Sequence, residues 1–78
     1  MRNETGKKNY RKLLYYFENK FLVHFRDLNE VFYNGLILDL NEKKLTIVLK
    51  ERINGEIPFL LEDINTDSIT KFKEREEM

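Results

Sequence analysis

The chain contains no cysteine, so disulfide bonds and thiolate-ligated metals are excluded. Histidine and proline each occur once, and only three glycines are present. No stretch approaches the roughly 18 consecutive apolar residues of a membrane-spanning helix. The polar residues 1–8 are unlike a secretory signal peptide. We therefore expect a soluble, cytoplasmic protein with no membrane partner.

An excess of one charge is also missing, because fourteen basic and fourteen acidic residues give a net charge of zero. The chain as a whole therefore has no field that attracts nucleic acid. Residues 1–12 are nevertheless basic, since Arg2, Lys7, Lys8, Arg11 and Lys12 face only Glu4. Such a segment can bind phosphates by releasing condensed counterions. A solvated tail and helix face is the simpler interpretation.

What the chain does contain is a short helical stripe followed by five segments of strand character. Tyr10, Leu13, Leu14 and Phe17 recur at helical spacing. They predict a helix over residues 9–19, with Asn9 as its N-cap and Asn19 as its stop. Apolar alternation predicts the strands Phe21–Arg26, Val31–Leu40, Leu45–Ile53, Glu56–Leu61 and Asp67–Phe72, with a helical turn at Glu62–Asn65 before the last. One apolar face of each of the first three strands carries alternate residues: Phe21, Val23 and Phe25; Leu36, Leu38 and Leu40; and Leu45, Ile47 and Leu49.

Turn and breaker residues divide these strands. Gly35 interrupts the long second strand and predicts a bulge or sharp bend. Asn54-Gly55 predicts a two-residue type I′ hairpin turn. Pro58 cannot donate a ladder hydrogen bond, so it indicates an edge or a bulge. Together these features predict a mostly β fold, in which an N-terminal helix precedes a five-stranded, strongly bent antiparallel barrel.

The predicted domain organisation is simple. One domain spans residues 1–78. It divides into a flexible basic N-terminus (1–8), a helix (9–19), the barrel (21–72) and a charged tail (73–78).

Three runs carry a resemblance to a known family. They are Leu13 to Asp27, with hydrophobic alternation that ends in Arg26-Asp27, and the strands around Gly35-Leu36 and Leu45–Leu49. Over residues 10–72 the chain resembles the Sm-like family (Sm, Lsm and Hfq proteins), and more broadly small SH3-like barrels. The resemblance implies an RNA-binding module that forms six- or seven-membered rings by pairing strand four with the next subunit's strand five.

The resemblance also has departures. Asn41 is the nearest match to the family's acidic pocket residue, and Lys44 or Leu45 falls where the family has asparagine. The run Leu61-Glu62-Asp63 replaces the family's Arg-Gly or Lys-Gly after strand four.

Residues in and beside the predicted loops could contact a single-stranded nucleic acid. These candidate binding residues are Arg26, Asp27, Asn29, Asn41, Lys43, Lys44, Lys7 and Lys8. No catalytic group, metal site or cofactor is predicted, because His24 has no recognisable nucleophile or orienting acid. We expect a protein that is not an enzyme.

Two functions fit this sequence. The first is an Sm-like barrel that binds RNA or single-stranded DNA, as a homo-oligomeric ring joined through strand edges. The alternative is an SH3-like protein–protein interaction or assembly module without nucleic-acid binding. The first predicts a basic face with salt-sensitive binding. The second predicts an exposed apolar patch or an unpaired strand edge.

Overall fold

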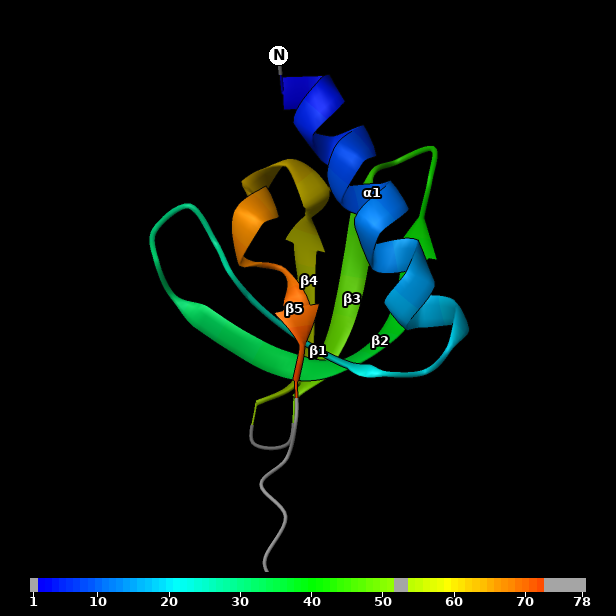
Figure 1. Cartoon of the computed structure of the whole chain (residues 1–78), viewed down its shortest axis with the longest axis vertical. Coiled ribbons are helices and arrows are strands. Elements are labelled where there is room, and N and C mark those ends of the chain that lie inside the picture. Colours follow the sequence, from blue (N-terminus) through cyan, green and yellow to red (C-terminus); the bar gives the residue numbers. More distant parts are fainter. Residues whose placement is uncertain (1, 52–53, 73–78) are drawn as a thin grey trace, which may run out of the picture.

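A computed structural model describes residues 2–51 and 54–72. Helix α1 (Arg2–Glu18) comes first (Figure 1). Strands β1 (Leu22–Arg26), β2 (Phe32–Asn41), β3 (Thr46–Glu51) and β4 (Gly55–Leu60) follow it. Two single turns of 3-10 helix, η1 (Leu61–Asp63) and η2 (Thr66–Ser68), lead into the short strand β5 (Thr70–Lys71).

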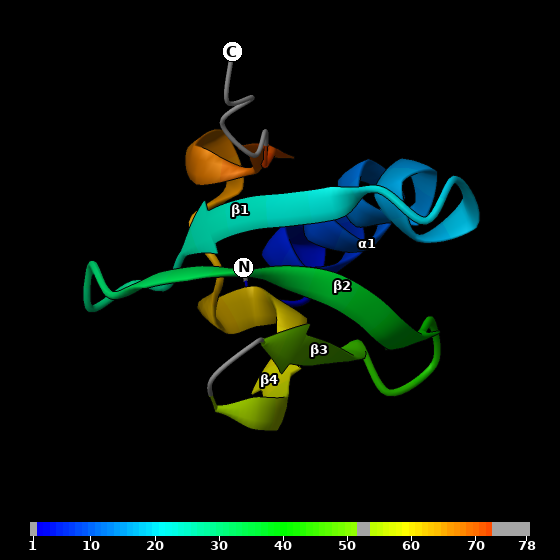
Figure 2. The same cartoon turned by 90° about the horizontal axis from the view of Figure 1, so that it is seen from below.

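The five strands form one antiparallel sheet in the order β4-β3-β2-β1-β5. The mostly β fold with one N-terminal helix is therefore confirmed. Figures 1 and 2 show a strongly curved sheet, in which the long strand β2 bends along its length. The sheet is not closed into a barrel, because its end strands β4 and β5 do not pair with each other. The described part of β5 is only two residues long and is used in pairing with β1.

Close packing between β2 and β3 accounts for the glycine in β2. A Cβ atom on Gly35 would lie 2.3 Å from the carbonyl oxygen of Lys50, so no larger residue fits without moving the backbone. The register of β2 against β3 shifts between Ile37 and Asp39, which leaves Leu38 as the bulged residue. The expected irregularity is present, but the bulge falls three residues after the glycine.

The core lies between the concave face of the sheet and the helix. Alternate residues of β1 and β3 are fully buried, as the sequence predicts: Val23, Phe25, Ile47 and Leu49. In β2 the structure instead buries Ile37, whereas Leu38, expected on one face with Leu36 and Leu40, is exposed because of the bulge. Leu13 of α1 and Leu61, Ile64 and Ile69 of the segment before β5 complete the cluster.

Helix α1 is longer than predicted. It begins at Arg2, so residues 2–8, expected as a flexible basic segment, are helical. Asn9 is consequently not an N-cap but a fully buried residue inside the helix. The end of the helix is close to the expected one: Lys20 adopts a left-handed conformation (φ 56°), and Phe21 N donates to Tyr16 O at 3.0 Å. This is a Schellman-type termination.

The connection between β3 and β4 differs from the predicted two-residue turn. Glu51 pairs with Gly55, so residues 52–54 make the connection, and Gly55 is the first residue of β4 with φ 74°. A glycine in the left-handed region at this position is typical of longer hairpin loops with a bulge. The expected strand end at Ile53 and the charged tail 73–78 lie outside the described residues.

Candidate functional site

The candidate binding residues predicted for the loops fall at the two opposite ends of β2. Arg26, Asp27 and Asn29 precede this strand, whereas Asn41, Lys43 and Lys44 stand at its end or follow it. The strand has ten residues, so its path is about 30 Å long at the usual rise. The two loops therefore stand at opposite ends of a long, curved strand, and their contact with one nucleic-acid strand stays a prediction.

The loop between β1 and β2 is organised by Asp27. Its carboxylate accepts hydrogen bonds from the backbone N–H groups of Asn29 (2.9 Å) and Val31 (3.0 Å). The backbone N–H of Asp27 donates to Val31 O at 3.0 Å and closes the loop. Asp27 is therefore a loop-forming residue first, and Asn29 is an exposed residue of that loop.

Arg26 is also tied into the fold. Its backbone N–H donates to Ser68 Oγ at 2.9 Å, and its carbonyl accepts from Asn65 N at 3.0 Å. The Nε atom of Arg26 is buried and has no hydrogen-bond partner among the described residues. Arg26 lies opposite Phe32 in the sheet, so it belongs to the β1–β2 end of the molecule.

The loop between β2 and β3 is held in a similar way. Asn41 Oδ1 accepts a hydrogen bond from Lys44 N at 2.8 Å, so Asn41 shapes the turn. Lys43 and Lys44 are exposed. The side-chain oxygen of Asn41 is thus already used within the loop, and a contact from Asn41 to a ligand stays a prediction.

The first half of α1 lies against this same loop (Figure 1). A Cβ on Gly6 would be 3.1 Å from Leu45 Cδ1 and 3.7 Å from Glu62 N, so the glycine permits close packing of the helix on the loop and on η1. Lys7 and Lys8 follow Gly6 and are exposed. Four candidate residues thus lie at one end of the molecule, which we call the basic end: Lys7, Lys8, Lys43 and Lys44.

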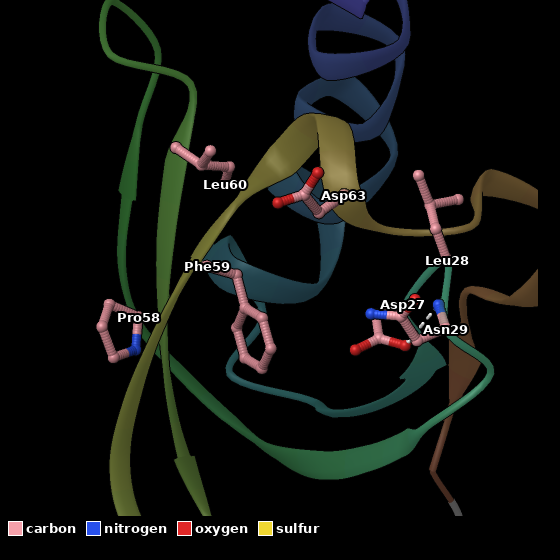
Figure 3. A pocket seen from close by; sticks show the side chains of 7 residues that line it. All are labelled: Asp27, Leu28, Asn29, Pro58, Phe59, Leu60 and Asp63. Atoms are coloured by element: carbon pink, nitrogen blue, oxygen red, sulfur yellow. Dashed lines mark hydrogen bonds between the residues drawn. The ribbon is translucent and has the colours of Figure 1, made fainter.

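A groove lies between β4 and the β1–β2 loop (Figure 3). Its volume is about 510 Å³, which is enough for a side chain or two of a partner. Pro58, Phe59 and Leu60 line one wall, the β1–β2 loop (Asp27–Asn29) lines the other, and Asp63 stands between them. Leu28 and Leu60 are unusually exposed for leucine, at 62% and 48%. The lining combines apolar side chains with two carboxylates and has no cation among the described residues.

Asn9, expected as an N-cap, instead ties helix α1 to the segment after β4, which borders both the basic end and the groove. Asn9 donates from Nδ2 to the carbonyl oxygens of Leu61 (2.7 Å) and Ile64 (2.9 Å). Its Oδ1 accepts from Thr66 Oγ1 at 2.6 Å. The only signal in the sequence was an asparagine among apolar helix positions, and such a residue is equally typical of a helix cap.

One tyrosine near the groove has a shifted acidity. Tyr33 is partly buried, and its hydroxyl donates a weak hydrogen bond to Asp27 Oδ2 at 3.5 Å. Burial, followed by the negative charge of Asp27 and this hydrogen bond, raises the pKa of Tyr33 above 10.0. The phenol therefore stays neutral at physiological pH.

The described residues contain no group of three or more acidic or histidine side chains placed to hold a metal ion. Within residues 2–51 and 54–72, no helix is long and apolar enough to cross a membrane. Comparison with protein-family models finds no match, and neither do comparisons with curated proteins and with solved structures.

Proposed function

We propose that this chain is a non-enzymatic, Sm-like binding module whose basic end contacts single-stranded RNA or DNA. The observation that carries the proposal is the packing of α1 on the β2–β3 loop, which gathers lysines from residues 7–8 and 43–44. Lysines on two rigid elements contact the phosphate backbone without reading sequence. The exposed Glu4 and Glu42 lie in the same two elements, so the affinity is expected to be modest and salt-sensitive.

The fold supports the Sm-like part of this proposal in outline. A helix precedes five antiparallel strands, and a strongly curved sheet leaves β4 and β5 as its two edges. The resemblance noted in the sequence implies that such edges join neighbouring subunits. We include this self-association in the proposal, since a ring would repeat the basic end around a common axis and strengthen binding through multivalency.

The test is a salt titration of binding to a short fluorescent uridine-rich RNA. We expect the double variant Lys43→Gln/Lys44→Gln to weaken binding and to reduce the slope of log affinity against log salt by about two, one for each lost phosphate contact. Both lysines are exposed, so the fold is expected to be unchanged. Circular dichroism checks that expectation.

A matched control uses lysines of the same charge elsewhere. Lys20 is exposed and lies at the end of α1 remote from the β2–β3 loop, and Lys50 is exposed on β3. The double variant Lys20→Gln/Lys50→Gln should leave the salt slope almost unchanged. Equal losses in the two double variants would mean that binding follows total charge and not the basic end.

A specific observation favours the alternative function, a protein-interaction module. The groove beside β4 is apolar and acidic, which suits a protein segment better than a phosphate chain. Native mass measured by light scattering, with and without RNA, separates the two functions. A monomer or dimer that ignores RNA would favour the interaction module.

A further inference from the structure

The hydrogen-bond pattern shows which backbone groups β4 presents at its open edge. Leu61 N donates to Leu45 O at 2.8 Å, beyond the pair Thr46–Leu60. Bonded and non-bonded pairs alternate along an antiparallel ladder. The pairs Thr46–Leu60, Val48–Pro58 and Lys50–Glu56 are therefore non-bonded pairs, so their β4 members direct their main-chain groups away from β3.

Glu56 and Leu60 consequently offer N–H groups at the open edge, and Glu56 and Pro58 offer carbonyl groups. No described strand pairs with this edge. Pro58 has no N–H and removes the middle donor. This arrangement partly protects the edge from unwanted sheet extension. A strand that pairs here can still accept hydrogen bonds from the two N–H groups and donate hydrogen bonds to the two carbonyl groups.

The groove runs along this same edge (Figure 3). Phe59 and Leu28 supply apolar surface on opposite walls, and Leu60 adds a half-exposed side chain at the rim. Asp27 places a carboxyl group within the lining. A partner that fills the groove therefore needs apolar side chains and is favoured by a positive charge.

We propose that the groove and the edge of β4 together bind an extended segment of another protein in which apolar residues alternate with lysine or arginine. The segment adds a strand to β4, its main chain bonds to Glu56, Pro58 and Leu60, and its cation lies near Asp27. Alternation follows from strand geometry, which sends successive side chains to opposite faces.

A second copy of this chain is the competing occupant. The described β5 is a poor match for the six residues of β4. Phe72 N donates to Leu22 O at 2.9 Å beyond the pair Val23–Lys71, so only Lys71 directs both main-chain groups outward. A longer foreign segment uses more of β4 than this strand does.

The binding test uses two capped ten-residue peptides, one with alternating valine and lysine and the other with glutamate in place of lysine. Fluorescence anisotropy with the full-length chain should show binding of the lysine peptide and at least about tenfold weaker binding of the glutamate peptide, a difference of about 1.4 kcal/mol. A lysine peptide N-methylated at every second residue should bind at least as poorly, because it cannot complete the ladder. Equal binding of the lysine and glutamate peptides, or of the methylated and unmethylated ones, would overturn the proposal.

A substitution locates the site. Leu60→Lys places a positive charge in the groove at an exposed position, and it should weaken lysine-peptide binding about fivefold or more. The control Leu38→Lys, at an exposed leucine of β2 outside the groove, should not. If Leu60→Lys instead leaves peptide binding unchanged and converts an oligomer to a monomer, a second copy is the occupant and the proposal fails. Neither substitution removes a lysine of the basic end, so neither should weaken RNA binding, and this inference and the proposed nucleic-acid function can fail separately.

Discussion

The loops at the two ends of β2 are built alike but present different surfaces. In each, an aspartate or asparagine at the start accepts backbone N–H groups: Asp27 in the β1–β2 loop and Asn41 in the β2–β3 loop. Each also contains one residue other than glycine in the left-handed region, Glu30 (φ 66°) and Leu45 (φ 55°). Asp27 and Asn41 therefore determine the conformation of their loops but do not determine what the loops bind.

The difference arises from what lies next to each loop. The β1–β2 loop faces the edge of β4 and forms an apolar, acidic groove with it. The β2–β3 loop packs against the first half of α1 through Leu45 and Gly6, and both elements carry exposed lysines close in sequence to that contact. Tertiary neighbours therefore give one end an affinity for protein segments in our proposal and the other an affinity for phosphates.

Both loops are nevertheless attached to the same segment. Leu61 N donates to Leu45 O at 2.8 Å at one end, and Leu28 N donates to Asp63 O at 3.0 Å at the other. Asn9 holds this segment to the helix through the carbonyls of Leu61 and Ile64. A change at Asn9 should therefore affect both ends at once.

The largest expected effect follows from Asn9→Leu. The substitution keeps the side-chain size at a fully buried position, but it leaves the Ile64 carbonyl without a donor and the Thr66 hydroxyl without its acceptor. The Leu61 carbonyl loses one donor and keeps the other, Ile64 N at 3.2 Å. Each unsatisfied buried group costs about 1–3 kcal/mol, so we expect a loss of about 2–4 kcal/mol in the free energy of unfolding. Urea denaturation measures it, and amide hydrogen exchange should accelerate at both Leu28 and Leu61.

Thr66→Val is the matched control, because it removes only the hydroxyl that donates to Asn9 Oδ1. It should cost about 1 kcal/mol. If Asn9→Leu costs no more than this, or if exchange increases at only one of the two loops, Asn9 does not couple the two ends.

Much of the fold could be predicted because it follows from local patterns. Alternation identified the inward residues of β1 and β3, such as Phe25 and Ile47, and Gly35 indicated the irregular strand. The start of the helix was harder to predict than its end. Asn19 indicated the helix stop, but no residue type predicted that the left-handed conformation would fall on Lys20. The polar residues before Asn9 gave no sign that the helix begins at Arg2.

The candidate site could be predicted only in part, for a physical reason. The sequence indicates which lysines are exposed, but whether they lie near one another depends on which helices, strands and loops pack together. The contact between Gly6 and Leu45 joins residues 39 positions apart in the chain. The groove is still less visible, since Pro58–Leu60 look like ordinary strand residues until the curved sheet brings the Asp27–Asn29 loop beside them.

A smaller effect should separate the two left-handed loop residues. Glu30→Gly removes the strain of a positive φ at an exposed position and should stabilise the protein by about 0.5–1 kcal/mol. Leu45→Gly removes the same strain but also loses a side chain packed against the core, and it should destabilise the protein by about 1–2 kcal/mol. Thermal unfolding of both variants measures the difference. Changes of the same sign would show that the two loops are not distinguished by packing.

The smallest effect is a loss of stability at high pH, and it should depend on Tyr33 near the groove. Because the folded state raises the pKa of Tyr33 above 10.0, the native phenol keeps a proton that the unfolded chain releases as the pH passes 10. This contribution to stability is therefore fully present below pH 10 and is lost as the pH rises through the folded pKa. Denaturation curves between pH 8 and 11 should show that the unsubstituted chain loses more stability than Tyr33→Phe, which has no such proton.

The Tyr33→Phe variant should lose little at neutral pH, where only a 3.5 Å hydrogen bond to Asp27 is removed. If both chains lost stability equally, the alkaline sensitivity would have to come from groups outside the groove end. Asp27 would then shape its loop, as Asn41 shapes the loop at the basic end, without a measurable effect of its charge on the ionisation of Tyr33.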